Sequence, residues 1–249
     1  GKFIAKTVFY VVCFKRKRDF MSNVLEMLQN GFVRNFITDD RYLFIVNGFF
    51  TTLQITFFAV LLGICVGFLI AMIRATHDMT GKLKLPNFIC RLYLTVIRGT
   101  PTMVQLLILY FIIFASVNNK TVVAILAFGI NSGAYVAEIV RSGIMSIDKG
   151  QMEAGRSLGF NYIQSMVYIV LPQALKNVLP ALGNEMIVLL KETAISGYIA
   201  IQDLTKGGDI IRSRTYDPYF PLLTVAAIYL IIVMIMTYFV NRLERRLRN

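Results

Sequence analysis

The sequence predicts an all-α polytopic membrane protein, because its composition is strongly apolar and its apolar residues form runs of membrane-spanning length. Of 249 residues, 56% are hydrophobic and only 16% are charged, and the mean hydropathy is +0.63. Soluble domains carry roughly 25% charged residues, so the chain is too apolar for that class. Five apolar segments approach the roughly 20 residues that a helix needs to cross a bilayer, and five spans are therefore expected.

The first 42 residues are expected to form an extension ahead of the membrane domain, which would occupy residues 43–249. Residues 3–14 are apolar but too short to span a bilayer, and the basic run of residues 15–18 follows them. A signal peptide has these parts in the opposite order, so the native translation start is expected at Met21. Residues 21–35 are expected to form an amphipathic helix that lies on the membrane.

The first predicted span covers Ile55 to Ile73, a run without a charge. Gly63, Gly67 and Ala71 recur every four residues within it and share one helical face. Small residues on one face let another helix approach closely. We expect such packing here; irregular lipid exposure is the alternative.

The second predicted span covers Gly99 to Val117, and Pro101 lies near its start, three residues after Arg98. A proline frees backbone groups that only the interior of a bundle can satisfy within a membrane. This span is therefore expected to face protein rather than lipid.

The third predicted span begins at Thr121 and covers the residues to Ala137. Its polar residues share one helical face with those that follow it; they are Asn131, Tyr135, Glu138 and Ser142. A polar stripe inside a membrane normally lines a bundle interior or a transport pathway.

The fourth predicted span, Val178 to Ile201, is interrupted by residues that need partners inside a membrane. These are Asn184, Glu185, Lys191, Glu192 and Thr193. Lys191 and Glu192 are adjacent, and adjacent residues do not face each other on a helix, so Glu138 is one candidate partner for Lys191. A polar loop from Gln202 to Asp217 and a fifth span from Tyr219 to Val240 follow.

A polar hairpin, residues 148–172, separates the third span from the fourth and is expected to contain two short helices. Asp148 and Asn161 each stand at an N-cap position, with a glutamine three residues further on. Gly159 is expected to end the first helix in the left-handed conformation. Pro172 is expected to stop the second, since its ring cannot continue the hydrogen-bond ladder.

Within this polar hairpin, an EAG triplet is followed at fixed distances by G and by I-x-L-P. The residues concerned are Glu153, Ala154, Gly155, Gly159, Ile169, Leu171 and Pro172. The spacing resembles the EAA loop of binding-protein-dependent ABC importer permeases, and the one departure is Gly155, where that family usually has alanine. The resemblance implies a cytoplasmic coupling helix that fits a groove on an ATPase subunit. An ordinary helix on the membrane surface is the alternative.

Three further stretches look like those of polar amino acid importers: residues 98–101 (RGTP), 133–143 (GAYVAEIVRSG) and 190–193 (LKET). The resemblance runs from about Asn35 to the C-terminus and implies the five-helix core of a type I ABC importer permease. The residues expected along its substrate pathway are Arg98, Asn131, Tyr135, Glu138, Asn184, Glu185, Lys191, Glu192 and Thr193. For Lys191, both a contact with a bound amino acid and a structural ion pair stay open.

The same resemblance implies the partners and the mechanism. No GxxxxGK[ST] phosphate-binding loop occurs in the chain, so ATP hydrolysis is expected in two separate ATPase subunits and the chain is not expected to be an enzyme. An extracytoplasmic binding protein would deliver a polar amino acid, with the loop Gln202 to Asp217 as a candidate docking surface. A second permease copy or a paralogue would complete the complex, which would work by alternating access.

Charge distribution predicts the orientation. With the polar hairpin in the cytoplasm, the cytoplasmic segments hold about threefold more Lys and Arg than the external ones. The N-terminus is then outside and the C-terminus inside a prokaryotic cytoplasmic membrane.

Other classes of function are weighed against this prediction. A secondary transporter is disfavoured because no inverted repeat of spans is visible, and a membrane anchor would not need the spaced hairpin; another small polar solute is an alternative substrate. The net charge of +12 does not indicate nucleic acid binding, since the basic residues lie between apolar runs. Cys13, Cys65, Cys90 and His77 fit no metal or redox spacing, so no metal, cofactor or catalytic site is expected.

Overall fold

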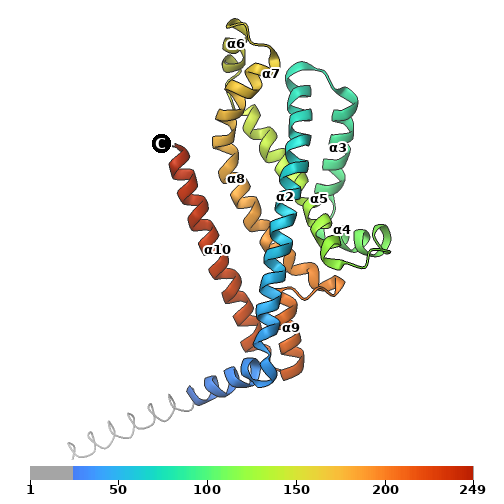
Figure 1. Cartoon of the computed structure of the whole chain (residues 1–249), viewed down its shortest axis with the longest axis vertical. Coiled ribbons are helices and arrows are strands. Elements are labelled where there is room, and N and C mark those ends of the chain that lie inside the picture. The colour runs from blue at the N-terminus through green and yellow to red at the C-terminus, as the bar shows by residue number, and fades with distance from the viewer. Residues whose placement is uncertain (1–24, 249) are drawn as a thin grey trace, which may run out of the picture.

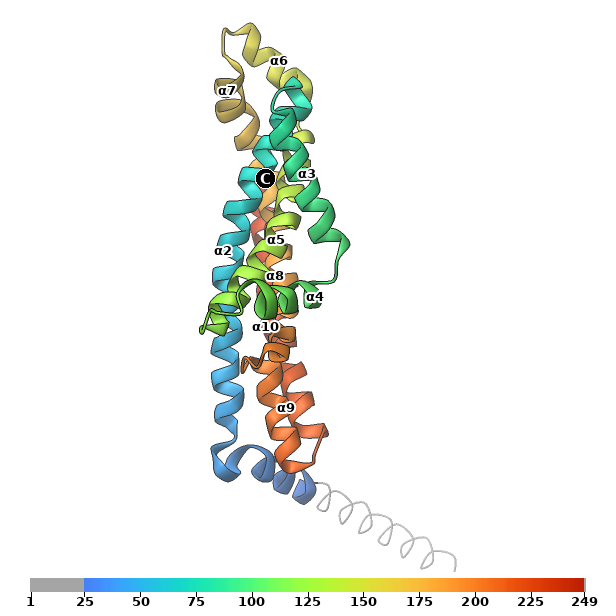
Figure 2. The same ribbon diagram turned by 90° about the vertical axis from the view of Figure 1, so that its right-hand side faces the viewer.

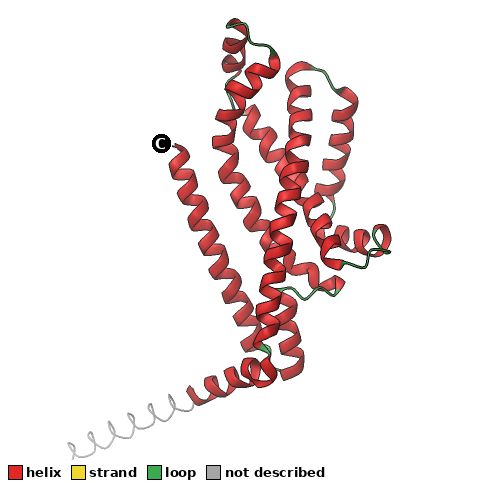
Figure 3. Cartoon of the chain, viewed as in Figure 1, coloured by secondary structure: helices red, strands yellow, loops and turns green. Residues whose placement is uncertain are grey.

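The computed structural model describes residues 25–248, and every regular element within them is helical (Figure 3). The bundle is elongated, and most of its long helices run along one axis (Figures 1 and 2). The polar hairpin lies at one end of this axis, and helix α9 (Leu204–Thr215) lies at the other. The predicted all-α class is confirmed.

Four helices are long and apolar enough to cross a membrane, and a bent pair makes a fifth crossing if it counts as one span. The four are Tyr42–Thr80, Lys120–Met145, Tyr162–Ile199 and Tyr219–Leu247. Each contains most of an expected span and extends beyond it. The prediction of a multi-pass helical membrane protein is confirmed, although the second span differs in shape from the expectation.

Helix α2 (Tyr42–Thr80) packs along α5 (Lys120–Met145). At 1.5 Å per residue its 39 residues measure about 58 Å, nearly twice the thickness of a hydrocarbon core. A Cβ atom on Gly63 would lie 3.0 Å from Ser132 Oγ, and one on Gly67 would lie 2.8 Å from the carbonyl oxygen of Gly133. The predicted close approach of another helix is confirmed.

The second span is not a straight helix that starts at Gly99, as was expected. Helix α3 (Lys84–Gly99) ends there, and the segment formed by α4 (Thr102–Ile108) and the π-turn η3 (Leu109–Ile113) leaves at 108°. Thr100 and Pro101 are extended, because proline disfavours helical geometry in the residue before it.

Gln105 satisfies the backbone groups freed at this bend. Its Nε2 donates to the carbonyl oxygens of Ile97 and Thr100, at 2.7 and 3.0 Å, and its Oε1 accepts from Asn131 Nδ2 at 2.9 Å. Gln105 therefore supplies the partners that Pro101 was expected to require. Most residues of α4 and η3 are exposed or partly exposed in this chain, so the expectation that the span faces protein stays a prediction. Sequence reasoning did not single out Gln105.

The fourth span is α8 (Leu171–Glu192), which leads into the 3-10 turn η5 (Thr193–Ile199). The segment expected as a polar loop from Gln202 is mostly helix α9, and α10 (Tyr219–Arg248) follows it. Leu204, Gly207, Gly208 and Ile211 form the buried face of α9. The loop prediction is wrong, because the two glycines of this segment are packing positions within a helix.

Two glycines bring α9 directly against α2. A Cβ atom on Gly207 would lie 2.4 Å from the carbonyl oxygen of Phe44, and one on Gly48 would lie 2.5 Å from that of Asp203. Both neighbours are backbone atoms that cannot turn aside. The contact between the two helices therefore requires the absence of a side chain at both positions.

The first described residues form helical turns beside the turn between α9 and α10 (Figure 1). Residues 25–32 are helical, and η1 (Val33–Ile37) and η2 (Thr38–Asp40) follow. Buried Asn35 donates from Nδ2 to Asp217 Oδ2 at 2.8 Å and accepts at Oδ1 from Thr215 Oγ1 at 2.8 Å. The predicted helix is thus present in part, and its position on the membrane stays a prediction. The expected start at Met21 lies outside the described residues.

Candidate functional site

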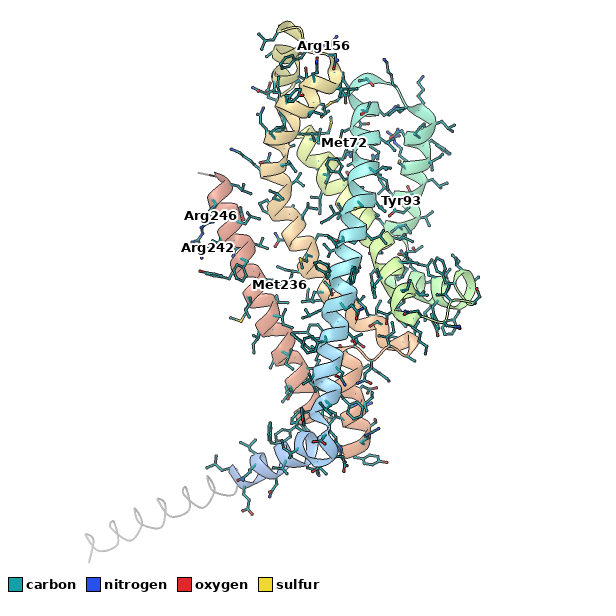
Figure 4. The ribbon with its side chains drawn as sticks, in the orientation of Figure 1. Met72, Tyr93, Arg156, Met236, Arg242 and Arg246 are labelled. Carbon is teal, nitrogen blue, oxygen red and sulfur yellow. The ribbon has the colours of Figure 1, made fainter. Side chains whose placement is uncertain are left out.

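The polar hairpin forms a compact knob at one end of the bundle (Figures 1 and 2). It consists of α6 (Lys149–Ser157), α7 (Tyr162–Ser165) and the π-turn η4 (Met166–Val170), which runs directly into α8. Arg156 lies at its tip (Figure 4). The predicted pair of short helices is present.

Local hydrogen bonds fix the ends of both short helices. Asp148 caps α6 through a 2.7 Å bond from the Gly150 N–H to Oδ1. Asn161 and Gln164 form the predicted capping box, with two reciprocal bonds of 2.9 Å. Gly159 has φ of +88°, so the predicted left-handed end of α6 is confirmed.

The helix does not stop at Pro172, contrary to the expectation. Pro172 lies in the first turn of α8, directly after the π-turn. A proline is tolerated in a first turn, where its missing N–H costs no α-helical hydrogen bond. Gln151 also differs from its expected capping role, since its Oε1 accepts from Gln173 Nε2 at 3.2 Å and ties α6 to α8.

Gly155 packs α6 against the second half of the polar hairpin. It is the one buried residue of α6, and a Cβ atom there would lie 2.7 Å from Ile169 Cδ1 and 2.8 Å from Ser165 Oγ. Glu153 and Ala154 face outward. Gly155 is therefore a packing position of the motif, and Glu153 and Ala154 are surface positions.

Large apolar side chains project from the same knob. Leu158 is 78% exposed, and Ile163 and Tyr168 are each 69% exposed. Large apolar side chains this exposed on a polar knob make it a candidate docking surface. Sequence reasoning missed these three residues, although an isolated leucine beside Gly159 in a polar helix was a usable signal.

A second candidate site is a hollow of about 560 Å³ between α3, α5 and α8. We call it the polar hollow. The polar side chains that line it are Arg98, Tyr135, Glu138, Ser142, Ser146, Asn177 and Glu185. The guanidinium of Arg98 lies 5.6 Å from the centre of the Tyr135 ring, which it faces.

Glu138 is bound by arginines and not by Lys191, which corrects the predicted pairing. Arg74 Nη1 lies 2.8 Å from Glu138 Oε2, and Arg141 Nη2 donates to Glu138 Oε1. Arg141 also reaches Asp78 on α2, at 3.2 Å. This network joins α2 to α5, so the two oxygens of Glu138 are already occupied.

Glu185 is in a different situation from Glu138. Its Oε1 accepts from Ser132 Oγ at 3.2 Å, and no salt bridge in the described part of the chain includes it. The polar hollow therefore contains an arginine that stacks on a ring and a carboxylate with no cation beside it.

The remaining predicted pathway residues lie elsewhere. Asn131 is buried against Gln105, and the hydroxyl of buried Thr193 donates to the carbonyl of Leu190. Asn184 and Lys191 are exposed and Glu192 is partly exposed, and none of the three lines the polar hollow. The structure thus brings together Arg98, Tyr135, Glu138 and Glu185, and it adds Asn177 and Ser146, which sequence reasoning missed.

Comparison with known proteins places these features in a family. A family profile described as the inner membrane component of binding-protein-dependent transport systems matches residues 63–249. A putative glutamine transport system permease protein of Rickettsia typhi is 38% identical, over 83% of this chain and 94% of its own length. The arginine transport system permease protein of Bacillus subtilis is 35% identical, over 83% of this chain and 93% of its own length.

Solved structures agree with these relatives. A crystal structure of an amino acid ABC transporter with histidines is 42% identical, with a TM-score of 0.76, and the match covers 85% of this chain and 98% of that one. An inward-facing methionine ABC transporter shares the fold at 21% identity, with a TM-score of 0.71 over 84% of this chain and 98% of that one. This chain therefore belongs to the family of binding-protein-dependent transport system inner membrane components.

Proposed function

We propose that this chain is the permease subunit of an ATP-driven importer and that it carries a polar amino acid across the cytoplasmic membrane by alternating access. The observation that carries the proposal is the polar hollow, which contains a guanidinium and a carboxylate that has no salt bridge among the described residues. An amino acid zwitterion has one charge of each sign and complements both groups. The names of the relatives, glutamine and arginine transport permeases, agree with such a substrate.

Substrate binding is assigned to two residues of the polar hollow. Arg98 would bind the α-carboxylate, because a guanidinium donates two parallel hydrogen bonds to a carboxylate. Glu185 would bind the α-ammonium, because it has no cationic partner among the described residues. Glu138 would hold α2 against α5, since Arg74 and Arg141 bind both of its oxygens.

Energy coupling is assigned to the polar hairpin. Its exposed apolar residues Leu158, Ile163 and Tyr168 would enter a groove on one of the two ATPase subunits, and Glu153 and Ala154 would lie beside them. Gly155 would keep the knob rigid, so that movement of the ATPase subunits reaches α8, whose Glu185 lines the polar hollow.

The other partners follow from the ends of the bundle. The end with the polar hairpin would lie in the cytoplasm, which the basic residues in the C-terminal turns of α10, among them Arg242 and Arg246 (Figure 4), support. Helix α9 would then face outward and receive the substrate-binding protein. Helix α10 exposes a long apolar face, because only 6% of its most apolar segment is buried within the chain. A second permease copy or a paralogue would cover part of this face.

Co-purification tests the proposed function. A tagged full-length chain should carry ATPase subunits through purification, and binding protein loaded with glutamine or arginine should stimulate their ATP hydrolysis. A chain that purifies alone and moves an amino acid with an ion gradient would instead be a secondary transporter. If only binding protein loaded with another small polar solute stimulated ATP hydrolysis, the chain would still be an importer subunit, and that solute would be its substrate.

Leu158→Asp is expected to abolish ATPase association without affecting membrane insertion. Burial of a leucine contributes about 2 kcal/mol, and a carboxylate in its place would have to be desolvated, so binding should weaken at least about 30-fold. Leu158→Met, which keeps the apolar volume, is the matched control. Normal co-purification of the aspartate variant would remove the docking role of this surface.

Glu185→Gln is expected to weaken uptake at low substrate concentration at least about tenfold, because a hydrogen bond to a charged group contributes about 1.5–3 kcal/mol. Assembly should be retained, since glutamine still accepts from Ser132. Lys191→Met is the matched control and should leave uptake within about twofold. Unchanged uptake by Glu185→Gln, or loss of uptake by Lys191→Met with intact assembly, would move the substrate site out of the polar hollow.

A further inference from the structure

Asp203 is a completely buried carboxylate that the proposed transport mechanism does not use. It lies between η5 and α9 and is 0% exposed. Its Oδ2 accepts from the Thr205 N–H at 3.0 Å and its Oδ1 accepts from the Lys206 N–H at 3.3 Å. These bonds cap α9 and involve no cationic side chain.

The elements around Asp203 are packed closely against it. On α2, Thr52 Oγ1 accepts from the neighbouring Leu204 N–H at 3.0 Å. On η5, a Cβ atom at Gly197 would lie 3.3 Å from Asp203 Oδ1. Water therefore has little room to stabilise the carboxylate. Any change in the charge of Asp203 affects the contact between α2, η5 and α9.

None of these elements offers Asp203 a compensating charge. On α9, Lys206 Nζ is turned to Asp209 Oδ2 at 2.9 Å. On α10, the titratable side chain that faces Asp203 is Tyr229, whose hydroxyl forms hydrogen bonds with the side chains of Thr52 and Thr205. Residues 44–56 of α2 and 193–199 of η5 contain no charged side chain. In the described part of the chain, no salt bridge includes Asp203.

We propose that Asp203 is a reversible proton-binding site that makes the packing of α9 against α2 and α10 depend on pH. The protonated form removes a buried charge that has no partner, and the ionised form restores it. In the proposed topology α9 lies on the external side, so the site would respond to external acidity.

The direction of the effect follows from the pKa. Burial raises the pKa of Asp203 from 3.8 to about 6, and the hydrogen bonds from the N–H groups of Thr205 and Lys206 oppose the rise. Because the carboxyl group binds its proton more tightly in the folded chain than in the unfolded chain, protonation stabilises the fold. This stabilisation is complete at pH values below the pKa of the unfolded chain, and it is lost as the pH rises through the pKa of the folded chain. The packing of α9 should therefore be tightest below about pH 4 and should loosen up to about pH 6.

Thermal unfolding of the full chain in lipid nanodiscs tests this proposal. Asp203→Asn keeps an oxygen that can cap α9 but never ionises. Its melting temperature should equal that of the wild type at about pH 4 and exceed it on the order of 5 °C at about pH 7.5. Asp209→Asn removes a partly exposed carboxylate that is paired with Lys206 and Arg212. Its difference in melting temperature from the wild type should not grow between about pH 4 and about pH 7.5 in this way.

A direct titration covers the case in which Asp203→Asn does not fold. Infrared spectra of the wild-type chain with isotope-labelled aspartate should contain one buried carboxyl band that titrates with a midpoint near 6. A midpoint near the ordinary value of about 4, or a constant difference in melting temperature between Asp203→Asn and wild type, would overturn the proposal.

Discussion

Gly207→Val should prevent the chain from reaching its native bundle. The new Cβ atom would lie 2.4 Å from the carbonyl oxygen of Phe44 and 2.9 Å from its carbonyl carbon. Because these are backbone atoms of α2, the two helices must separate, and α9 would lose its buried face. We expect a loss of more than about 3 kcal/mol, at the upper end of overpacking costs, measured as the yield of monodisperse protein and its melting temperature.

Gly99→Val is the matched control for that change. Gly99 is the last residue of α3, and a Cβ atom there has no neighbour within 4 Å. Its yield and melting temperature should stay close to those of the wild type. Equal behaviour of the two variants would show that the contact between α2 and α9 does not hold this end of the bundle together.

Gly159→Val should stop transport while the chain still inserts and folds. Gly159 has φ of +88° with open space around its Cβ position, so the only penalty is backbone strain, on the order of 1–2 kcal/mol and larger for a β-branched residue. The Phe160 N–H bond to the Gly155 carbonyl, 3.1 Å long, would break, and α6 would leave its place. ATP-dependent uptake should fall at least about tenfold.

Gly159→Asn separates strain from a general effect of substitution, since asparagine tolerates the left-handed conformation better than other residues with side chains. It should retain most of the transport activity in the same uptake assay. Wild-type uptake by Gly159→Val would instead show that the shape of the polar hairpin does not matter for coupling.

The features predictable from sequence are those that local patterns determine. Span cores follow from uncharged runs, the capping box from Asn161 and its glutamine, and the end of α6 from Gly159. The face formed by Gly63 and Gly67 also follows from spacing, because small residues four apart let a partner helix approach whatever that partner is.

The features that sequence did not predict depend on contacts between distant segments. The helix over Leu204–Thr215 depends on its contact with α2, where Gly207 lies against the backbone of Phe44. The bend at Pro101 has a direction that only the contact between Gln105 and Asn131 defines. Pro172 continues a helix because the π-turn before it changes the register.

The same reasoning applies to the charges. Periodicity places Glu138 on the polar face of α5, but it does not choose among the arginines and lysines of the chain, and Arg74 is 64 residues away. The choice of partner depends on how α2 lies against α5. For the same reason, sequence could not distinguish Glu185, which lines the polar hollow, from Lys191, which does not.

Uptake of labelled glutamine and arginine into proteoliposomes tests the central claim most directly. The vesicles would contain this chain with its ATPase subunits, ATP inside, the binding protein outside and no ion gradient. Uptake should require ATP and the binding protein, and it should disappear with Leu158→Asp while Leu158→Met retains it. Uptake that continues without ATP, or that the aspartate variant supports at the wild-type rate, would contradict coupling through the polar hairpin.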